Sequence, residues 1–239
     1  MTYSDYASDG SIRLWMDIST YCNAACPQCH RTNPNGLGKQ HFLPLIQWSK
    51  EQFAKAFSPE SMNKIAEFDF CGTWGDPVMN KDIFEICQYI IENTEKTKIA
   101  IHTNGSIRDE IWWWKLGVMC GKRLNVVFAI DGTDQETHAF YRQGTDLELV
   151  LANAEALAET QSSVETFTVL FKHNDDMVKD IQDLARSIGA RRAYFTKSNR
   201  FHNKRNHNGY EFFKDRERYV FHPSKAEKEF WGVTLNASG

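Results

Sequence analysis

The chain alternates between two patterns of apolar residues. Short runs rich in β-branched and aromatic residues are typical of buried strands, and longer segments with apolar residues three and four positions apart are typical of helices with one buried face. Regular alternation of the two predicts a parallel sheet with crossover helices. We expect strands at residues 13–18, 67–71, 98–102, 125–130, 166–171 and 193–196. We expect helices at residues 49–56, 81–92, 109–119, 147–159 and 175–188, and a further helix near residues 224–231.

Six β/α units are therefore predicted in a chain of 239 residues, a length that suits one large α/β domain. The sequence contains no internal repeat and no low-complexity linker that would divide it. The segment at residues 31–44 contains Asn33, Pro34, Gly36 and Gly38, which predict a long loop. Such a loop in a compact domain is often functional.

Charge and cysteine content restrict the cellular setting. The formal charge is −3, from 28 Lys and Arg against 31 Asp and Glu, which is too small to favour a nucleic acid or a membrane surface as partner. No stretch approaches the ~18 apolar residues of a membrane span, and the first residues do not have the pattern of a signal peptide. Three of the six cysteines, Cys71, Cys87 and Cys120, are isolated from one another, unlike a disulfide framework. We expect a cytoplasmic protein.

The other three cysteines have the spacing of a metal site. Cys22, Cys26 and Cys29 form a C-x3-C-x2-C motif directly after the first predicted strand. Three thiolates on one short loop can hold three irons of a [4Fe–4S] cluster and leave the fourth iron open to an external ligand. The alternative is a structural zinc site, which needs a fourth protein ligand such as His30 or a distant cysteine.

Polar or glycine-rich segments also follow the next three strands. They are Gly72-Thr73-Trp74-Gly75-Asp76-Pro77, Thr103-Asn104-Gly105 and Asp131-Gly132-Thr133. The carboxyl ends of parallel strands meet at one end of a sheet, where active sites of such folds lie. Gly72 and Gly75 let the backbone approach a ligand closely. We therefore expect these segments and the cysteine motif to form one site.

These motifs together resemble the radical S-adenosylmethionine superfamily, and in particular its SPASM/twitch-related branch, which usually carries extra C-terminal iron–sulfur domains. The family signature is C-x3-C-x2-C followed by GGEP-like, TNG-like and S-x-D-G-like motifs, and the resemblance covers residues 12–196. It implies a partial (β/α)6 barrel at residues 1–198 with a short C-terminal extension at residues 199–239 that covers the barrel mouth. Because no cysteine follows Cys120, we expect the auxiliary-cluster domain to be absent.

The resemblance also implies roles for individual residues. Cys22, Cys26 and Cys29 would ligate the cluster, whose open iron would bind the amino and carboxylate groups of S-adenosylmethionine. Asn104 would contact ribose hydroxyls, and Arg142 would offer a two-pronged fork to the methionine carboxylate. The implied cofactor-binding residues are Trp74, Gly75, Asp76, Pro77, Asn104, Asp131 and Arg142.

Three positions depart from the family pattern. Asp76 stands where many members have Glu, and Ala129 stands where many have Ser. Gln28, just before the third cysteine, occupies a position that is often aromatic and placed against the adenine. The backbone of the turn around Gly75 is the part that the family uses against the cofactor, so a shorter acid there is compatible with the role.

The function implied by the resemblance is reductive cleavage of S-adenosylmethionine to a 5′-deoxyadenosyl radical, which abstracts hydrogen from a substrate. An external one-electron reductant of the flavodoxin or ferredoxin type would be a partner. A peptide or protein is favoured as substrate over a small metabolite, because the related branch often modifies peptides. The alternative function is that of a non-enzymatic zinc-binding or interaction protein that uses the same cysteines.

Overall fold

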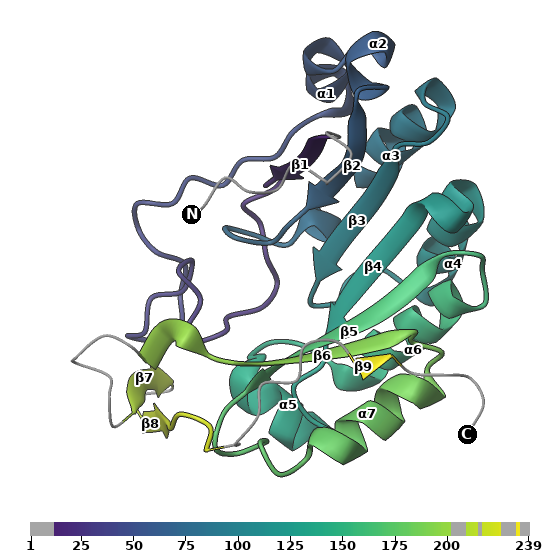
Figure 1. The fold of residues 1–239 in the computed structure, drawn as a ribbon. Helices are drawn as coiled ribbons and strands as arrows, with labels where there is room; N and C mark the ends of the chain where they lie inside the picture. Colours follow the sequence, from purple (N-terminus) through teal and green to yellow (C-terminus); the bar gives the residue numbers. More distant parts are fainter. Residues whose placement is uncertain (1–11, 202–208, 215–216, 226–232, 235–239) are drawn as a thin grey trace.

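A twisted sheet of parallel strands forms the framework of the protein. The computed structural model describes residues 12–201, 209–214, 217–225 and 233–234. Six parallel strands follow one another across the sheet in chain order, and β9 (Val233–Thr234) pairs antiparallel with the last of them (Figure 1). They are β1 (Ile12–Met16), β2 (Ile65–Phe70), β3 (Lys98–Thr103), β4 (Leu124–Ala129), β5 (Ser163–Leu170) and β6 (Arg192–Lys197). The predicted α/β fold with a partial (β/α)6 barrel is confirmed.

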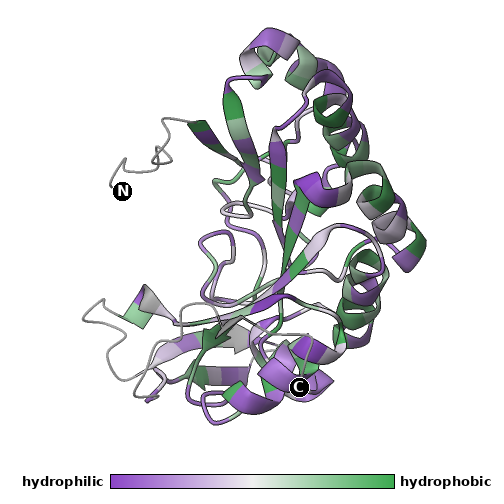
Figure 2. Ribbon diagram, turned by 45° about the vertical axis from the view of Figure 1, so that its right-hand side comes forward, coloured by the Kyte–Doolittle hydropathy of each residue, from purple (hydrophilic) through white to green (hydrophobic). Residues whose placement is uncertain are grey.

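Helices cover one side of this sheet. The helices are α1 (Lys50–Ala56), α2 (Pro59–Met62), α3 (Ile83–Asn93), α4 (Glu110–Cys120), α5 (Gln135–Tyr141), α6 (Leu147–Ala158) and α7 (Val178–Ser187). Of these, α3, α4, α6 and α7 lie along the same side of the strands (Figure 1), and α3, α6 and α7 carry the mixture of hydrophobic and polar residues expected for half-buried helices (Figure 2). The helix α4 is apolar on most sides, and its Ile111, Trp114 and Val118 are exposed. In α3, for example, Ile83, Ile86 and Ile90 are fully buried. The cysteine loop and the other functional segments lie on the opposite side.

Two apolar clusters hold the described chain together. The larger lies between the sheet and the helices and includes Phe53, Phe68, Trp113 and Phe128. It also contains Cys87 and Cys120. The smaller cluster joins the cysteine loop to later parts of the chain, and its buried members are Ala24, Cys26, Tyr141, Phe171, Phe201, Phe212 and Phe221. The described part of the C-terminal extension therefore packs directly against the cysteine loop.

Several short elements were not predicted. They are α2, α5, three 3-10 helices (η1, Pro77–Met79; η2, Gly121–Arg123; η3, Asn199–Phe201), β9 and the antiparallel pair β7 (Tyr210–Lys214) and β8 (Glu217–Phe221). The helices α2 and α5 have four and seven residues and show little of the helical period in the sequence, although α1, which also has seven residues, was predicted. The predicted helix near residues 224–231 falls mostly outside the described residues. Among those residues, no helix combines the length and apolar character needed to cross a lipid bilayer.

Candidate functional site

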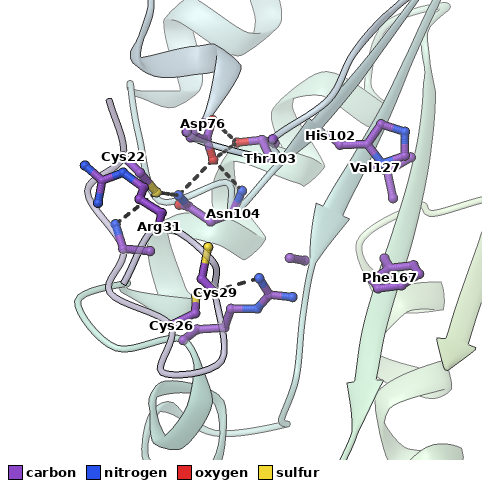
Figure 3. Close-up of a pocket in the computed structure, with 15 residues that line it drawn as sticks. Cys22, Cys26, Cys29, Arg31, Asp76, His102, Thr103, Asn104, Val127 and Phe167 are labelled. Atoms are coloured by element: carbon purple, nitrogen blue, oxygen red, sulfur yellow. Dashed lines mark hydrogen bonds between the residues drawn. The ribbon is translucent and has the colours of Figure 1, made fainter. Parts of the chain in front are cut away.

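A cavity of about 220 Å³ lies at the carboxyl ends of the parallel strands. All three cysteines of the motif line it, and so do residues from the loops after β2 and β3, from β4 and from the end of α5 (Figure 3). Its lining comprises Cys22, Ala24, Cys26, Cys29, Arg31, Gly72, Gly75, Asp76, His102, Thr103, Asn104, Val127, Ala129, Arg142 and Phe167. The predicted residues Trp74, Pro77 and Asp131 lie near this cavity in sequence but are not part of its lining.

The cysteine loop is fixed to two neighbouring segments. The Ala25 N–H donates to the carbonyl of Gln143 at 2.8 Å, which ties the loop to the segment after α5. The Asn23 side-chain amide donates to the carbonyl of Ser106 at 2.9 Å, which ties it to the segment after β3. Within the loop, the Cys29 N–H donates to the carbonyl of Cys26 at 2.9 Å and forms a tight turn. The three thiols are thus presented to the cavity by a supported backbone.

The sulfurs of Cys22 and Cys26 each face hydrogen-bond donors. Cys22 Sγ accepts from the Ala24 N–H at 3.4 Å and lies 3.8 Å from Asn104 Nδ2. Cys26 Sγ lies 3.9 Å from Nη1 of Arg142. Burial raises the pKa of Cys22 well above its ordinary value and that of Cys26 to about 11. Without a metal both groups are neutral thiols, and because metals bind the thiolate, ligation must displace their protons.

The number and placement of possible ligands distinguish an iron–sulfur cluster from a structural zinc ion at these cysteines. A structural zinc ion needs four donors around one ion, whereas three cysteines of a cubic cluster each bind a different iron. His30, the nearest candidate for a fourth zinc ligand, is exposed and lies against the Trp74 ring, with centroids 6.2 Å apart. Among the described residues, no three His, Cys, Asp or Glu side chains are gathered as a site for a single metal ion. Three thiols around one cavity therefore fit a cluster with an open corner better than zinc.

The turn after β2 is held close to the loop that follows β1. A Cβ atom at Gly75 would lie 2.3 Å from the carbonyl oxygen of Ser19, so only glycine fits this approach. The Asp17 carboxylate accepts from the N–H groups of Thr73 and Trp74 at 2.9 and 3.2 Å. The Trp74 ring packs against His30 and the ring of Phe42 instead of pointing into the cavity. The backbone of the turn, rather than this ring, is what borders the cavity.

Asp76 is buried at the end of this turn. Its carboxylate accepts from the N–H of Val78 at 3.0 Å, from the hydroxyl of Thr103 at 3.0 Å, and from both the backbone and the side-chain amide of Asn104 at 2.8 Å (Figure 3). Burial outweighs these bonds and raises the pKa of Asp76 to about 6. Asn104 is itself held at both ends, because its amide also donates to Asn23 at 2.8 Å and its oxygen accepts from the Ser106 N–H at 2.9 Å.

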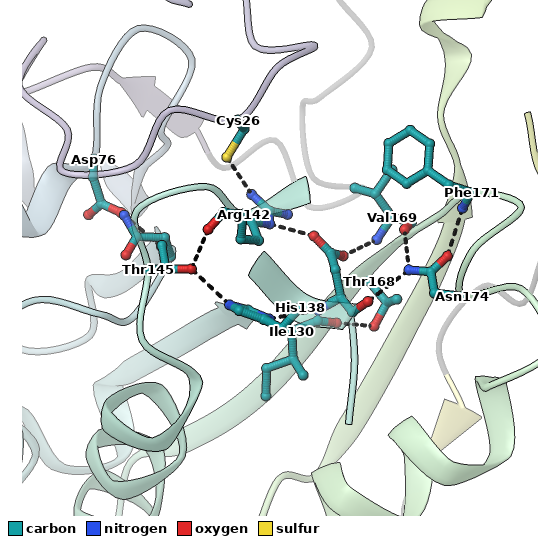
Figure 4. A network of polar contacts seen from close by, with 12 residues as sticks. Cys26, Asp76, Ile130, His138, Arg142, Thr145, Thr168, Val169, Phe171 and Asn174 are labelled. Atoms are coloured by element: carbon teal, nitrogen blue, oxygen red, sulfur yellow. Dashed lines mark hydrogen bonds and ion pairs between the residues drawn. The ribbon is translucent and has the colours of Figure 1, made fainter. Parts of the chain in front are cut away.

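Asp131 and Arg142 form a buried ion pair beside the cavity (Figure 4). Arg142 Nε donates to Oδ2 of Asp131 at 2.5 Å, and the second carboxylate oxygen accepts from the Val169 N–H at 2.6 Å. Burial opposes the charge of Arg142, but the negative charge of Asp131 favours it and raises the pKa of Arg142. The sequence placed both residues at the site without indicating that they pair with each other.

Other residues that shape the site were not predicted. Thr103 holds Asp76, and His138 and Thr145 support the backbone of Arg142. Asn174, after β5, donates to the carbonyl of Asp131 at 2.9 Å. These contacts join residues far apart in the sequence, so the sequence alone does not indicate them. Only Thr103 could have been proposed as a site residue, because it belongs to the TNG-like segment.

Gln28, the position before the third cysteine, is 4% exposed. Its oxygen accepts from the hydroxyl of Ser198 at 2.6 Å, and its backbone carbonyl accepts from the guanidinium of Arg200. Its side-chain Nε2 is buried without a hydrogen-bond partner in the described chain. Residues at the start of the C-terminal extension thus fix this part of the cysteine loop.

The chain is similar in sequence or in fold to proteins of known description. GTP 3',8-cyclase of Photorhabdus laumondii is 28% identical over 167 residues, which are 69% of this chain and 47% of the relative. The crystal structure of Streptococcus suis SuiB bound to precursor peptide SuiA superposes with a TM-score of 0.61 at 16% identity, over 78% of this chain and 39% of that one. The structure of hexahistidine-tagged anSMEcpe with bound AdoMet gives a TM-score of 0.59 at 18% identity, over 77% and 49% of the two chains. The chain thus spans about half, or less, of the length of each of these proteins.

The match to a family model covers most of the chain. The Radical SAM superfamily model matches residues 16–185, from the end of β1 into α7. This confirms the predicted family, and with it the class of cofactors, because the family is one of enzymes that use a [4Fe–4S] cluster and S-adenosylmethionine. The SPASM/twitch-related branch stays a prediction. The chain belongs to the radical S-adenosylmethionine superfamily.

Proposed function

We propose that this protein binds a [4Fe–4S] cluster through Cys22, Cys26 and Cys29 and uses it to cleave S-adenosylmethionine reductively. The observation that carries the proposal is that three thiols from one loop line a single cavity together with the Gly75 turn and Asp76. The donor set leaves one corner of a cubic cluster without a protein ligand, as binding of an external ligand requires.

The residues around the cavity would divide the work of binding. The turn that contains Trp74, Gly75, Asp76 and Pro77 would present its backbone to the amino group of S-adenosylmethionine. Asn104 would lie toward the ribose, and Asp131 would orient Arg142 toward the methionine carboxylate. When bound, the cluster and S-adenosylmethionine supply one-electron cleavage of the C5′–S bond and a 5′-deoxyadenosyl radical that takes hydrogen from the substrate. The protein contributes orientation and exclusion of water.

We infer that the substrate is a peptide or protein and that the electron comes from an external carrier of the flavodoxin or ferredoxin type. The likeness to SuiB, whose structure contains a precursor peptide, supports a peptide. The relative described as a GTP 3',8-cyclase supports the competing class, a small metabolite.

The core of the proposal is tested by anaerobic reconstitution with iron and sulfide, followed by dithionite and S-adenosylmethionine. We expect brown protein that contains iron and sulfide and releases 5′-deoxyadenosine, quantified by liquid chromatography. Cys26→Ala should abolish the product, whereas Cys71→Ala, which changes a cysteine outside the cavity lining, should retain it. Colourless protein with one bound zinc, or equal product from wild type and Cys26→Ala, would contradict the assignment.

The substrate class is tested separately with the reconstituted protein. A cell extract is divided by ultrafiltration into a macromolecular and a small-molecule fraction, and each is incubated with the enzyme, reductant and S-adenosylmethionine. A mass change in a peptide or protein of the first fraction supports the proposal. A changed compound in the second fraction, or conversion of added GTP, would replace it with the small-metabolite function.

A further inference from the structure

The guanidinium of Arg142 lies between a carboxylate and a cysteine sulfur. Its Nε donates to Asp131 at 2.5 Å, and its Nη1 lies 3.9 Å from Sγ of Cys26 (Figure 4). A distance of 3.9 Å is too long for a bond to oxygen but suits an N–H donor that faces the larger sulfur atom. Two of its nitrogens are therefore directed at groups inside the protein.

The backbone of Arg142 is fixed by the end of α5. Its N–H donates to the carbonyl of His138 at 3.0 Å, and its own carbonyl accepts from the hydroxyl of Thr145 at 2.6 Å. The Thr145 oxygen also lies 3.0 Å from Nε2 of His138, whose Nδ1 accepts from the Asp131 N–H at 3.3 Å. Burial lowers the pKa of His138 to about 3, so this histidine is neutral and serves as a structural link.

The side chain of Arg142 is fixed by Asp131. The other carboxylate oxygen of Asp131 accepts from the Val169 N–H at 2.6 Å, and its backbone carbonyl accepts from Asn174 at 2.9 Å. Asp131 is fully buried and the Arg142 side chain is 16% exposed. The pair is neutral overall, but it is an oriented dipole whose positive end is next to Cys26.

Cys22 also has donors at its sulfur, but none of them in the described chain is a charged group. Cys22 faces the neutral N–H groups of Ala24 and Asn104, and the carboxylate of Asp76 adds to the rise of its pKa. The charge of Arg31 opposes this rise, but Arg31 makes no hydrogen bond to the Cys22 sulfur in the described chain. At Cys26, by contrast, Arg142 favours the thiolate. The two cysteines thus sit in different electrostatic surroundings although they belong to one loop.

We propose that Arg142, oriented by Asp131, raises the reduction potential of the cluster through a charged N–H···S hydrogen bond to Cys26. The inference rests on the proposed function, in which Cys26 is a cluster ligand. Reduction adds one electron, supplied by the external carrier, and therefore one negative charge to the cluster and its thiolates. A hydrogen bond and a positive charge at the sulfur stabilise the reduced form more than the oxidised form. Arg142 is a positioning residue here, because it acts through the sulfur of Cys26.

The test is a redox titration of the reconstituted protein without S-adenosylmethionine, so that a contact of Arg142 with the methionine carboxylate cannot contribute. The electron paramagnetic resonance signal of the reduced cluster is followed in wild type, Arg142→Lys and Arg142→Gln. At the wild-type midpoint we expect the ratio of reduced to oxidised cluster to fall about tenfold in Arg142→Gln, which is a shift of about 59 mV for a one-electron couple. Arg142→Lys keeps the charge and should shift less.

Two further variants separate this effect from loss of structure. Arg142→Gln leaves Asp131 buried without a cation, and this negative charge itself lowers the potential. The double variant Arg142→Gln/Asp131→Asn replaces the ion pair by two neutral amides and should show a smaller shift in the same direction. Arg186→Gln makes the same change at an exposed arginine on α7 and should leave the potential unchanged.

Each outcome decides the proposal. Midpoints equal to that of wild type in the Arg142 variants, with normal iron and sulfide content, would overturn it while leaving the cluster assignment intact. Loss of the cluster from every Arg142 variant would also overturn it and assign Arg142 to cluster retention. If wild type itself gives no cluster signal, the proposed function fails and this inference fails with it.

Discussion

Two buried carboxylates at the same end of the sheet are held in opposite ways. Asp76 follows β2 and Asp131 follows β4, and they are 3% and 0% exposed. The hydrogen-bond donors to Asp76 in the described chain are all neutral, namely N–H and hydroxyl groups of Val78, Thr103 and Asn104. Asp131 instead pairs with the guanidinium of Arg142.

The difference shows what each kind of partner can do in a protein interior. Neutral donors fix the position of Asp76 but do not cancel its charge, so burial raises its pKa to about 6, near physiological pH. A cation opposes the effect of burial on the charge of Asp131, but it makes the site depend on one side chain. We therefore expect the stability around Asp131 to depend most on Arg142. The stability around Asp76 should depend on the packing of the Gly75 turn and on pH.

The largest expected loss of stability comes from removing Arg142, the partner of Asp131. Arg142→Ala leaves the buried Asp131 without its cation, and breaking a buried pair in this way costs about 3–5 kcal/mol. We expect the free energy of unfolding to fall by that amount. It is measured by urea unfolding of cluster-free protein with tryptophan fluorescence.

The double variant Arg142→Gln/Asp131→Asn is the control for this measurement. It removes the charge of both partners and keeps polar groups that can bond to each other, so it should recover most of the lost stability. A single variant that is as stable as the double variant would show that the ion pair is not what holds this side of the cavity.

On the Asp76 side, the turn depends on a close approach of backbones rather than on charge. Gly75→Ala places a Cβ atom 2.3 Å from the carbonyl oxygen of Ser19. We expect a loss of about 1–3 kcal/mol in the same unfolding experiment, as for other overpacked sites. Gly38→Ala is the matched control, because a Cβ there meets no atom within 4 Å. Equal stability of the two variants would show that the turn moves freely away from Ser19.

Much of the fold could be predicted because its strands are short runs rich in β-branched and aromatic residues. All six parallel strands and the five longer helices that connect them appear close to the expected residues. The missed helix α5 has seven residues and buries only His138 and Tyr141, so it has no periodic pattern to detect. The β7–β8 pair is stabilised by ring contacts such as Phe212 with Tyr219, which form only after folding.

The site could be predicted where its residues are close together in the sequence. The spacing of Cys22, Cys26 and Cys29 points to a metal site by itself. The pairing of Asp131 with Arg142 has no such signal, because the two are joined through α5 and Asp131-Gly132 is also the sequence of an ordinary turn. The support from Val169 and Asn174 depends on how β5 lies beside β4.

The smallest expected effect is the pH dependence on the Asp76 side. Its pKa in the folded protein is about 6, above the ordinary value of 3.8, so the folded state binds the proton more tightly than the unfolded state. Between these two pKa values the free energy of unfolding rises as pH falls. Above the folded pKa, Asp76 is charged in both the folded and the unfolded state, and the cost of burying its charge is then at its maximum. Burial also raises the pKa of Asp131, but there the paired guanidinium of Arg142 opposes the rise.

Asp76→Asn isolates this contribution, because the amide does not titrate and other groups are unchanged. From about pH 8 to about pH 5, wild type should gain roughly 1 kcal/mol of unfolding free energy relative to the variant. The measurement is urea unfolding of both cluster-free proteins at the two pH values. The expectation fails if the difference in unfolding free energy between wild type and Asp76→Asn does not change with pH. The neutral donors would then stabilise the charged form of Asp76 in full, and Asp76 and Asp131 would differ only in the geometry of their contacts.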